Sequence, residues 1–371
     1  MQFVATEEQA LIQETARNFF QERVTSAGVR EVMESEAGYD RRLWHGVMAE
    51  MGFGGIALPA ECGGAGLGHV ELAIILMEMG RTLCPSPFLS SVAMAAPAIL
   101  VAGDEAQKAR WLPGIASGET IAALGWQEDG AATLSEQGGG YRLSGSARYV
   151  PYGHVADLFV IPARGAGGGL SLLAVPADTP GVRVEKHVAI DLTRPLATLH
   201  FEDVAVPADM FLGEPGGAAA AFARTLDLAR VALAAEQAGG AEALLDMTVQ
   251  YAKDRVQFGR PIGSFQAIKH RLADMMVQVE TAKTAAFYAA CVADENNAGL
   301  PEAAAIAKAY CSDAYLDCAG NAIQLHGGIG FTWEHDAHLY FKRARGSATL
   351  LGDGAAQRET VARILKLGEE N

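Results

Sequence analysis

The sequence is short of positive charge. Its 371 residues include 29 Lys and Arg against 44 Asp and Glu, which gives a formal net charge of −15 at pH 7. We therefore expect no nucleic-acid partner, because phosphate backbones are bound by clustered Lys and Arg. Half of the residues are hydrophobic, so the chain has enough apolar material for a large core.

Long apolar runs and paired cysteines are missing as well. No apolar run reaches the roughly 20 residues of a membrane-spanning helix. The acidic residues Glu7 and Glu8 lie where a signal or transit peptide would be basic or apolar, so we expect neither. The five cysteines form no Cys-x-x-Cys pair, which favours reduced thiols. We expect a soluble protein of the cytoplasm that does not contact a membrane.

Self-contained catalytic signatures are also missing. The sequence has no His-Glu-x-x-His zinc motif and no Gly-x-Ser-x-Gly nucleophile turn. Gly63–Gly68 lacks the spacing and setting of a dinucleotide fingerprint. Gly165–Gly169 is not followed by Gly-Lys-Ser/Thr, which favours a hairpin turn over a phosphate loop. The nine histidines show no metal-ligand spacing, so we expect no metal, and His326 beside two glycines indicates a structural contact.

Hydrophobic periodicity divides the chain into three blocks. Helical spacing prevails over residues 1–118, and between 119 and 215 short apolar runs of period two alternate with Gly, Pro and Asp. From 216 to 371 the helical period returns, and apolar residues at steps of three and four indicate an antiparallel bundle helix. The predicted fold class is α+β multidomain, with an N-terminal α-helical domain, a middle β-barrel or sandwich and a C-terminal four-helix bundle.

Two C-terminal segments combine helical patterns with specific polar side chains. In the first, we expect a helix to end at Gly259 and to restart after a Gly/Pro loop, with Arg255 and Gln266 near the bend. A guanidinium at that place suits a bidentate phosphate contact. The second segment, Gln324–Thr332, carries glycines that can bring backbone N–H groups close to a ligand or to another chain.

These segments resemble two motifs of the acyl-CoA dehydrogenase family, flavoproteins that introduce a trans α,β double bond into acyl-CoA thioesters. A third match is Pro59–Gly68, which resembles the family's Pro-Glu-x-x-Gly-Gly loop with Ala60 in place of the usual acid. The helix–β–helix order agrees with the family as well. The residues of the two C-terminal motifs are Arg255, Phe258, Gly259, Gln266, Gln324, Gly327, Gly328 and Gly330.

The resemblance implies that FAD lies between protomers. Arg255 would contact its pyrophosphate, with Phe258 and Gln266 beside it. Gln324 and Gly328 would reach the adenosine half across the same interface. Assembly and cofactor binding would then be coupled.

The resemblance also places residues of the β domain and of the C-terminus beside the flavin. Tyr149 lies where the family has a Trp-x-Thr segment, and its ring would cover the isoalloxazine. Pro151 offers no hydroxyl and no N–H, so the usual side-chain hydrogen bond to the flavin is replaced or absent. Gln357 is assigned to the cofactor too.

A helical pair and a carboxylate would act on the substrate. Asp227 and Arg230 match an Asp-x-x-Arg pair on the helix that lines the thioester site, and the alternative is a helix-surface salt bridge. The family places its catalytic Glu at one of two positions, and this sequence has Ala229 at the first and Asp353 at the second. Glu236, two turns after Ala229, is a weaker candidate.

Asp353 is one methylene shorter than Glu. It would serve as the base if the loop or the substrate moved about 1–1.5 Å closer, a displacement that matters for proton transfer. The alternative is that Asp353 is the N-cap of a helix over 355–366, a role that Asp performs well. Both roles can be combined.

The activity implied is that of an FAD-dependent acyl-CoA dehydrogenase. Asp353 would remove the α-proton while hydride leaves the β-carbon for flavin N5, giving trans-2-enoyl-CoA, and electrons would pass to electron-transfer flavoprotein. The segment Gly352-Asp353 resembles that of a branch of the family that degrades bulky acyl groups, including sterol side chains and rings. The resemblance therefore implies a role in the catabolism of sterols or in the β-oxidation of fatty acids. We expect a homotetramer built as a dimer of dimers, or a heterotetramer with a paralogous subunit.

Two alternatives stay open at this point. One is an acyl-CoA oxidase, which would hand electrons directly to oxygen. The other is a non-catalytic subunit that binds FAD or acyl-CoA and stabilises an active partner, since the usual Glu is missing and Pro151 lacks a donor.

Overall fold

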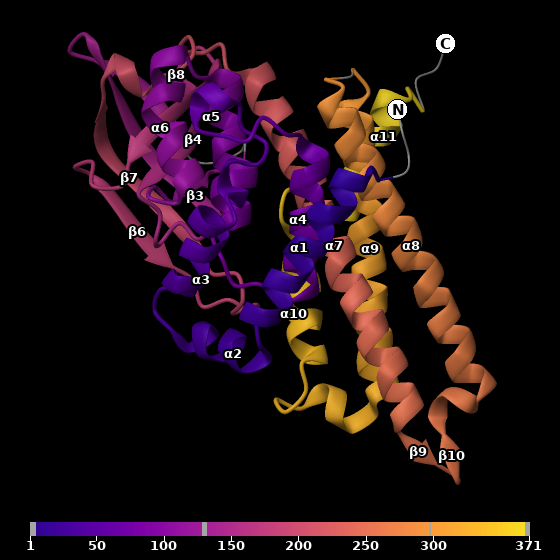
Figure 1. Cartoon of the computed structure of the whole chain (residues 1–371). Coiled ribbons are helices and arrows are strands. Elements are labelled where there is room, and N and C mark those ends of the chain that lie inside the picture. The colour runs from indigo at the N-terminus through magenta and orange to yellow at the C-terminus, as the bar shows by residue number, and fades with distance from the viewer. Residues whose placement is uncertain (1–4, 128–131, 297, 368–371) are drawn as a thin grey trace. The chain divides into compact units, whose positions relative to one another are not determined.

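The computed structural model describes residues 5–127, 132–296 and 298–367. The predicted fold class is confirmed, with N-terminal helices, a central β-sheet and a C-terminal helical bundle (Figure 1). The chain forms two compact units. The bundle unit comprises Met1–Arg30, His69–Cys84 and Arg230–Asn371, and the sheet unit comprises Glu31–Gly68 and Pro85–Ala229. The three sequence blocks remain a prediction, since the first block contributes to both units.

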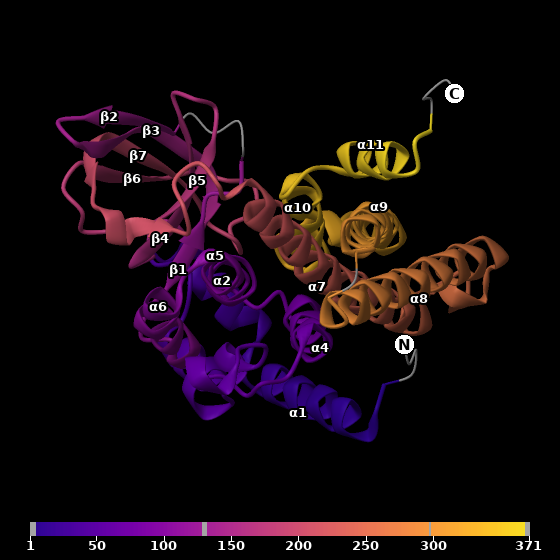
Figure 2. The ribbon, with the colours of Figure 1, turned by 90° about the horizontal axis from the view of Figure 1, so that it is seen from above.

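The bundle unit is built around one central helix. Figure 2 shows α9 end-on with α8, α10 and α11 around it, and α9 packs against each of the three. The helices α1 and α4 join the same unit, where α4 packs on α1 and on α8. The bounds are α1 Glu7–Arg23, α2 Ser26–Glu34, α4 His69–Arg81, α7 Ala219–Asp254, α8 Gln266–Asp294, α9 Leu300–His326, α10 Ala337–Thr349 and α11 Gly354–Ile364.

The predicted apolar stripe of the bundle is buried along most of α8. Its core-facing residues are Met275, Val279, Ala282, Ala286 and Ala289. They recur at steps of three and four, which keeps them on one helix face. The first turns of α8 carry the same pattern but are only partly buried.

Two glycines allow α4 and α7 to approach closely. A Cβ at Gly239 of α7 would lie 1.9 Å from the carbonyl oxygen of Met77, and a Cβ at Gly80 of α4 would lie 2.0 Å from that of Glu236. Real side-chain carbons do not come so near to backbone oxygens, so this helix crossing requires glycine on both sides.

A buried carboxylate ties α1 to the bundle. Glu78 of α4 is 2% exposed and accepts hydrogen bonds from Arg17 (3.1 and 2.8 Å) and Gln13 (3.2 Å) of α1. Arg81 on the next turn of α4 pairs with Glu242 of α7 at 2.6 Å. A buried charge is tolerated only when it is paired, which explains why polar residues of α1 face inward here.

The sheet unit contains the predicted short strands. The sheet order is β6-β7-β3-β2-β4-β5-β8, and β1 pairs with β4 in parallel. Among the described strands the path ends at β6 and β8 without closing, so the barrel, one of the two forms expected from the sequence, is wrong. The bounds are β1 Ala122–Leu124, β2 Thr133–Gln137, β3 Gly140–Pro151, β4 Leu158–Gly165, β5 Leu170–Pro176, β6 Val182–Lys186, β7 Leu196–Val206 and β8 Phe211–Leu212.

The sheet unit contains helical segments as well. The π-helical segment Leu89–Ala95 packs against β1. Three α-helices lie wholly within the unit, namely α3 Arg41–His45, α5 Ala96–Ala102 and α6 Glu105–Ser117. The glycine-rich segment Gly165–Gly169 is the hairpin turn between β4 and β5, with the Gly165 N–H donating to the Gly169 carbonyl at 3.0 Å. The sequence interpretation of this segment is confirmed. None of the helices within the described ranges is long and apolar enough to cross a membrane.

Candidate active site

The loop between α10 and α11 carries the predicted base. We call Leu350–Asp353 the Asp353 loop. Its backbone turns through two residues with positive φ, Leu351 at 62° and Gly352 at 91°. A φ of 91° strains any L side chain, so the turn favours glycine at position 352, and a Cβ there would also lie 2.6 Å from the side-chain nitrogen of Gln357.

Two predicted site residues hold the carbonyl at the centre of this loop. Arg230 Nε of α7 donates to the Leu351 carbonyl at 3.2 Å, and Gln357 Nε2 of α11 donates to the same oxygen at 3.0 Å. Arg230 of α7 therefore lies against the Asp353 loop, which is about 120 residues away in the sequence, whereas Gln357 follows the loop directly. Gln357 is 2% exposed, and its Oε1 is without a hydrogen-bond partner among the described residues.

Asp353 itself is the N-cap of α11. Its side chain accepts a hydrogen bond from the Ala356 N–H at 2.8 Å, and α11 starts at the next residue. The capping prediction is confirmed. The side chain remains exposed, so capping leaves the carboxylate accessible to a second group.

The Asp227–Arg230 pair lies in α7 as predicted. Asp227 is only 7% exposed, and the Arg230 guanidinium reaches the Asp353 loop. Asp227 therefore does not lie on an exposed face of the helix, and the role of the pair toward the substrate stays a prediction. Glu236, the weaker candidate for the base, is 7% exposed at its side chain and pairs with Arg343 at 2.8 Å. A carboxylate held in a buried ion pair is not presented to a substrate, and we discard Glu236.

The first C-terminal motif forms a projecting hairpin. Helix α7 ends at Asp254 and not at Gly259 as expected, because β9 (Val256–Gln257) and β10 (Arg260–Pro261) pair across a two-residue turn. That turn has positive φ at Phe258 (56°) and Gly259 (77°), which is the type I′ geometry of tight hairpins. Figure 1 shows the hairpin at the free ends of α7 and α8.

The predicted cofactor residues of this motif point outward. The Phe258 side chain is 91% exposed, and Arg255 and Gln266 are exposed as well. The neighbouring Arg260 lies over the Phe265 ring, 4.1 Å from its centroid, and is thereby engaged within the chain. Arg255 has no such ring contact or ion pair within the described part of the chain.

The second motif lies beside the first. Helix α9 ends at His326, and the turn Gly327–Phe331 follows, which leaves Gln324 and Gly328 exposed. Tyr251, one helical turn before the hairpin, stacks on the His326 ring with centroids 4.4 Å apart and donates its hydroxyl to the His326 carbonyl at 3.2 Å. His326 is 3% exposed, which fits the structural role predicted for it.

Two family models cover most of the chain. The description "Acyl-CoA dehydrogenase, N-terminal domain" matches residues 6–119, and "Acyl-CoA dehydrogenase, C-terminal domain" matches residues 216–366. The chain belongs to the acyl-CoA dehydrogenase family. Enzymes of this family are oxidoreductases, and the fold described above is theirs.

Relatives of this acyl-CoA dehydrogenase agree over its whole length. It is 38% identical to "Acyl-CoA dehydrogenase IpdE2" of Mycobacterium tuberculosis over 359 residues, which is 96% of each chain. It is 30% identical to "Caffeyl-CoA reductase-Etf complex subunit CarC" of Acetobacterium woodii, covering 97% of this chain and 98% of that one. Among solved structures, a chain of the ChsE4-ChsE5 complex from Mycobacterium tuberculosis superposes with a TM-score of 0.92 at 30% identity, covering 100% of both.

The sheet unit of this acyl-CoA dehydrogenase contains the remaining predicted residues. Tyr149 has a positive φ of 54° and is 46% exposed, and its ring meets His187 edge-on at 5.5 Å. Trp126 Nε1 donates to the Tyr149 carbonyl at 3.0 Å, and Ser90 Oγ donates to the Pro151 carbonyl at 2.7 Å. These two bonds fix the backbone that presents the Tyr149 ring.

One residue of the Asp353 loop environment was missed from the sequence. Lys308 of α9 is 0% exposed and donates to the carbonyls of Ala348 and Gly352 at 3.2 Å each. A signal was present, because Lys308 is the single charged residue in the small apolar stretch Ala303–Ala309 and shares a helix face with buried neighbours. A lysine on a core-facing stripe needs a polar partner inside the fold.

Proposed function

We propose that this acyl-CoA dehydrogenase uses Asp353 to remove the α-proton of an acyl-CoA thioester and releases trans-2-enoyl-CoA. The observation that carries the proposal is the Asp353 loop, whose backbone is held by side chains while its carboxylate stays accessible. An α-proton of a thioester is weakly acidic, so the base must be held in advance in a fixed position. Bound FAD supplies the acceptor for the β-hydride.

The shorter side chain of Asp353 narrows the substrate class. A carboxylate that is one methylene short must come about 1–1.5 Å closer to the α-carbon, and the bonds to Leu351 oppose movement of the loop. The substrate must therefore approach the loop. This supports acyl groups whose bulk presses the thioester toward Asp353, such as branched, cyclic or sterol-derived acyl chains.

The outward-facing motif residues fit FAD shared with a second subunit. The exposed Arg255 guanidinium is the right donor for a pyrophosphate, and the exposed Phe258 ring can cover part of the cofactor. Gly327 and Gly328 carry no side chain, and a Cβ on either would meet nothing within 4 Å, which allows close approach of an adenosine. We assign Gln266 and Gln324 to the same cofactor, and Tyr149 to the isoalloxazine face.

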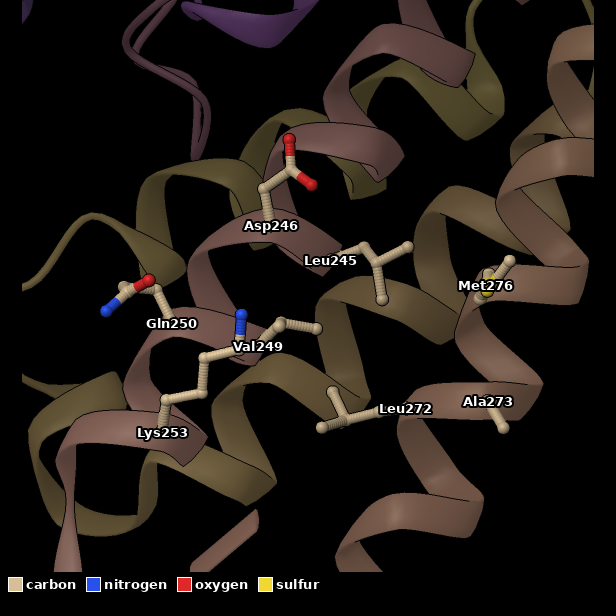
Figure 3. Close-up of a pocket in the computed structure, with 8 residues that line it drawn as sticks. All are labelled: Leu245, Asp246, Val249, Gln250, Lys253, Leu272, Ala273 and Met276. Atoms are coloured by element: carbon tan, nitrogen blue, oxygen red, sulfur yellow. The ribbon is translucent and has the colours of Figure 1, made fainter. Parts of the chain in front are cut away.

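Exposed apolar surface supports the proposed tetramer. A groove of about 490 Å³ lies between α7 and α8. Figure 3 shows its lining, in which the apolar residues Leu245, Val249, Leu272, Ala273 and Met276 lie beside the polar Asp246, Gln250 and Lys253. Met276 is 58% exposed, and the next residue, Val277, is 65% exposed. Contiguous exposed apolar side chains of this kind mark interfaces. The covering subunit is a second copy or a paralogue, the latter by analogy with the two-protein complex of the similar ChsE4-ChsE5 structure.

One observation favours a second candidate function. Pro151 has no donor where the family offers a side chain to the flavin, so the chain is also suited to a role as a partner subunit that lacks activity by itself. The electron acceptor is proposed to be electron-transfer flavoprotein, as the name of the similar CarC protein suggests, and oxygen is the alternative.

Flavin spectroscopy tests these proposals. After reconstitution with FAD, the protein is titrated without oxygen with straight-chain, branched and cyclic acyl-CoA thioesters, and bleaching of the flavin is recorded. We expect bleaching, fastest with a bulky thioester, and reoxidation by electron-transfer flavoprotein. A protein that binds no FAD contradicts the cofactor assignment, whereas FAD binding without bleaching by any thioester supports the partner-subunit role.

A further inference from the structure

We propose that Lys308 is a positioning residue for proton abstraction, because its buried side chain fixes the backbone from which Asp353 projects. The inference rests on the proposed function of Asp353. It assigns a role to a side chain that lies behind the loop and touches neither substrate nor cofactor.

The donors of Lys308 match its surroundings one to one. Nζ lies 2.8 Å from Ser312 Oγ and 3.2 Å from each of the carbonyl oxygens of Ala348 and Gly352. An ammonium has three N–H donors, and each has an acceptor here. Ser312 is held in turn by Gln237 of α7, whose Nε2 donates to Ser312 Oγ at 3.0 Å.

The two carbonyls lie on either side of the loop's turn. Ala348 belongs to the last turn of α10, where the final carbonyls lack helical partners. Gly352 directly precedes Asp353. One side chain thus connects the end of α10 to the residue before the base, while the Leu351 carbonyl between them is held separately by Arg230 and Gln357.

Packing alone does not account for a lysine at this place. Burying an ammonium is costly unless every donor is satisfied, and a Met side chain would fill a similar volume without that cost. The ammonium adds charge-assisted hydrogen bonds to backbone oxygens, which are stronger than hydrogen bonds between neutral groups. These hydrogen bonds fix the backbone geometry of the Asp353 loop.

The charge of Lys308 also makes the loop sensitive to alkaline pH. Burial lowers the pKa of Lys308 to about 8. The charged groups that face it are Arg230 from α7, which lowers the pKa further, and Asp353 and Asp313, which raise it. The titratable thiol of Cys311 also faces Lys308, but burial raises its pKa to about 12, so it is neutral near pH 8. Above pH 8 the neutral amine keeps two N–H donors for three acceptors, so one anchor is released and the loop loosens.

The decisive test is Lys308→Met in the full FAD-loaded protein. The substrate is the acyl-CoA thioester that bleaches the wild type fastest in the panel above. We expect the single-turnover bleaching rate to fall by about 10- to 100-fold, the size of effect that a misplacement of 1 Å produces, while the thioester Kd changes less than about threefold. The matched control is Lys283→Met, which removes a partly buried lysine of α8 that pairs with Glu242 and Glu280 and should leave the rate unchanged.

A second variant tests the same inference without removing the lysine. Ser312→Ala deletes one acceptor of the ammonium, which destabilises its charged form and lowers its pKa. The alkaline limb of the bleaching rate, expected near pH 8 in the wild type, should move to lower pH. This readout stays available if Lys308→Met does not fold.

The outcomes separate the inference from the function on which it rests. If Lys308→Met bleaches at the wild-type rate while Asp353→Asn is slow, the positioning role is overturned and Asp353 remains the base. If Ser312→Ala does not shift the alkaline limb of the bleaching rate, the positioning role of Lys308 is likewise overturned. If Asp353→Asn itself bleaches at the wild-type rate, both the proposed base and its positioning are wrong.

Discussion

The buried ion pair between Arg343 and Glu236 should contribute strongly to the stability of the bundle unit. Nη1 of Arg343 lies 2.8 Å from Oε1 of Glu236, and the two side chains are 3% and 7% exposed. Arg343→Met leaves the buried carboxylate without its guanidinium, a change that costs about 3–5 kcal/mol. Since whole proteins are stable by roughly 5–15 kcal/mol, the loss is readily measured.

Urea unfolding followed by far-UV circular dichroism gives the free energy of unfolding for each variant. The double variant Arg343→Met/Glu236→Leu should recover most of the loss, because a buried pair can be replaced by apolar side chains at little cost. The matched control is Arg358→Met, which breaks the Arg358–Asp313 pair with side chains 60% and 50% exposed and should cost less than about 1 kcal/mol. If Arg343→Met costs no more than Arg358→Met, the reasoning from burial is refuted.

Two further predictions concern the bundle unit. Gly239→Ala places a carbon against the Met77 carbonyl and should lower the free energy of unfolding by about 1–3 kcal/mol. Gly320→Ala in α9, where a Cβ meets nothing within 4 Å, should raise it by about 0.5–1 kcal/mol. Equal urea midpoints for the two variants would contradict this prediction. Burial lowers the pKa of His326 from its ordinary value of 6.5, so the unfolded chain is protonated first and stability is lost as pH falls below 6.5. The variant His326→Phe keeps a ring against Tyr251 but cannot be protonated. When the pH is lowered from 7 to 5, its free energy of unfolding should fall less than that of the wild type. An equal fall in the two proteins would contradict this prediction.

Much of the fold was predictable because it follows from local pattern. Apolar residues spaced by three and four from Met275 onward placed one face of α8 in the core, and that face is buried. The closure of the sheet was not predictable in this way. Whether β6 pairs with β8 depends on the twist and register of all strands between them. The alternation of side chains along a single strand gives no information on either.

The site was predictable where a motif is contiguous in the sequence. The segment around Arg255 and the segment around Gln324 were each singled out, yet their contact through Tyr251 and His326 is a property of helix packing. The end of α7 was placed too late because Phe258 adopts a positive φ that few residues other than glycine favour. Lys308 was missed because periodicity shows only which side chains face inward. The carbonyl groups that accept hydrogen bonds from its buried ammonium belong to residues 40 and more positions away, which the pattern of one helix does not reveal.

The central claim is that Asp353 is the base, and the bleaching rate of Asp353→Asn tests it most directly. Asn caps a helix about as well as Asp, so the bond to the Ala356 N–H and the free energy of unfolding should be retained. The amide cannot accept the α-proton. We predict a rate at least about 10²-fold below that of the wild type with an unchanged thioester Kd. A variant that binds FAD and thioester and bleaches at the wild-type rate would contradict the account.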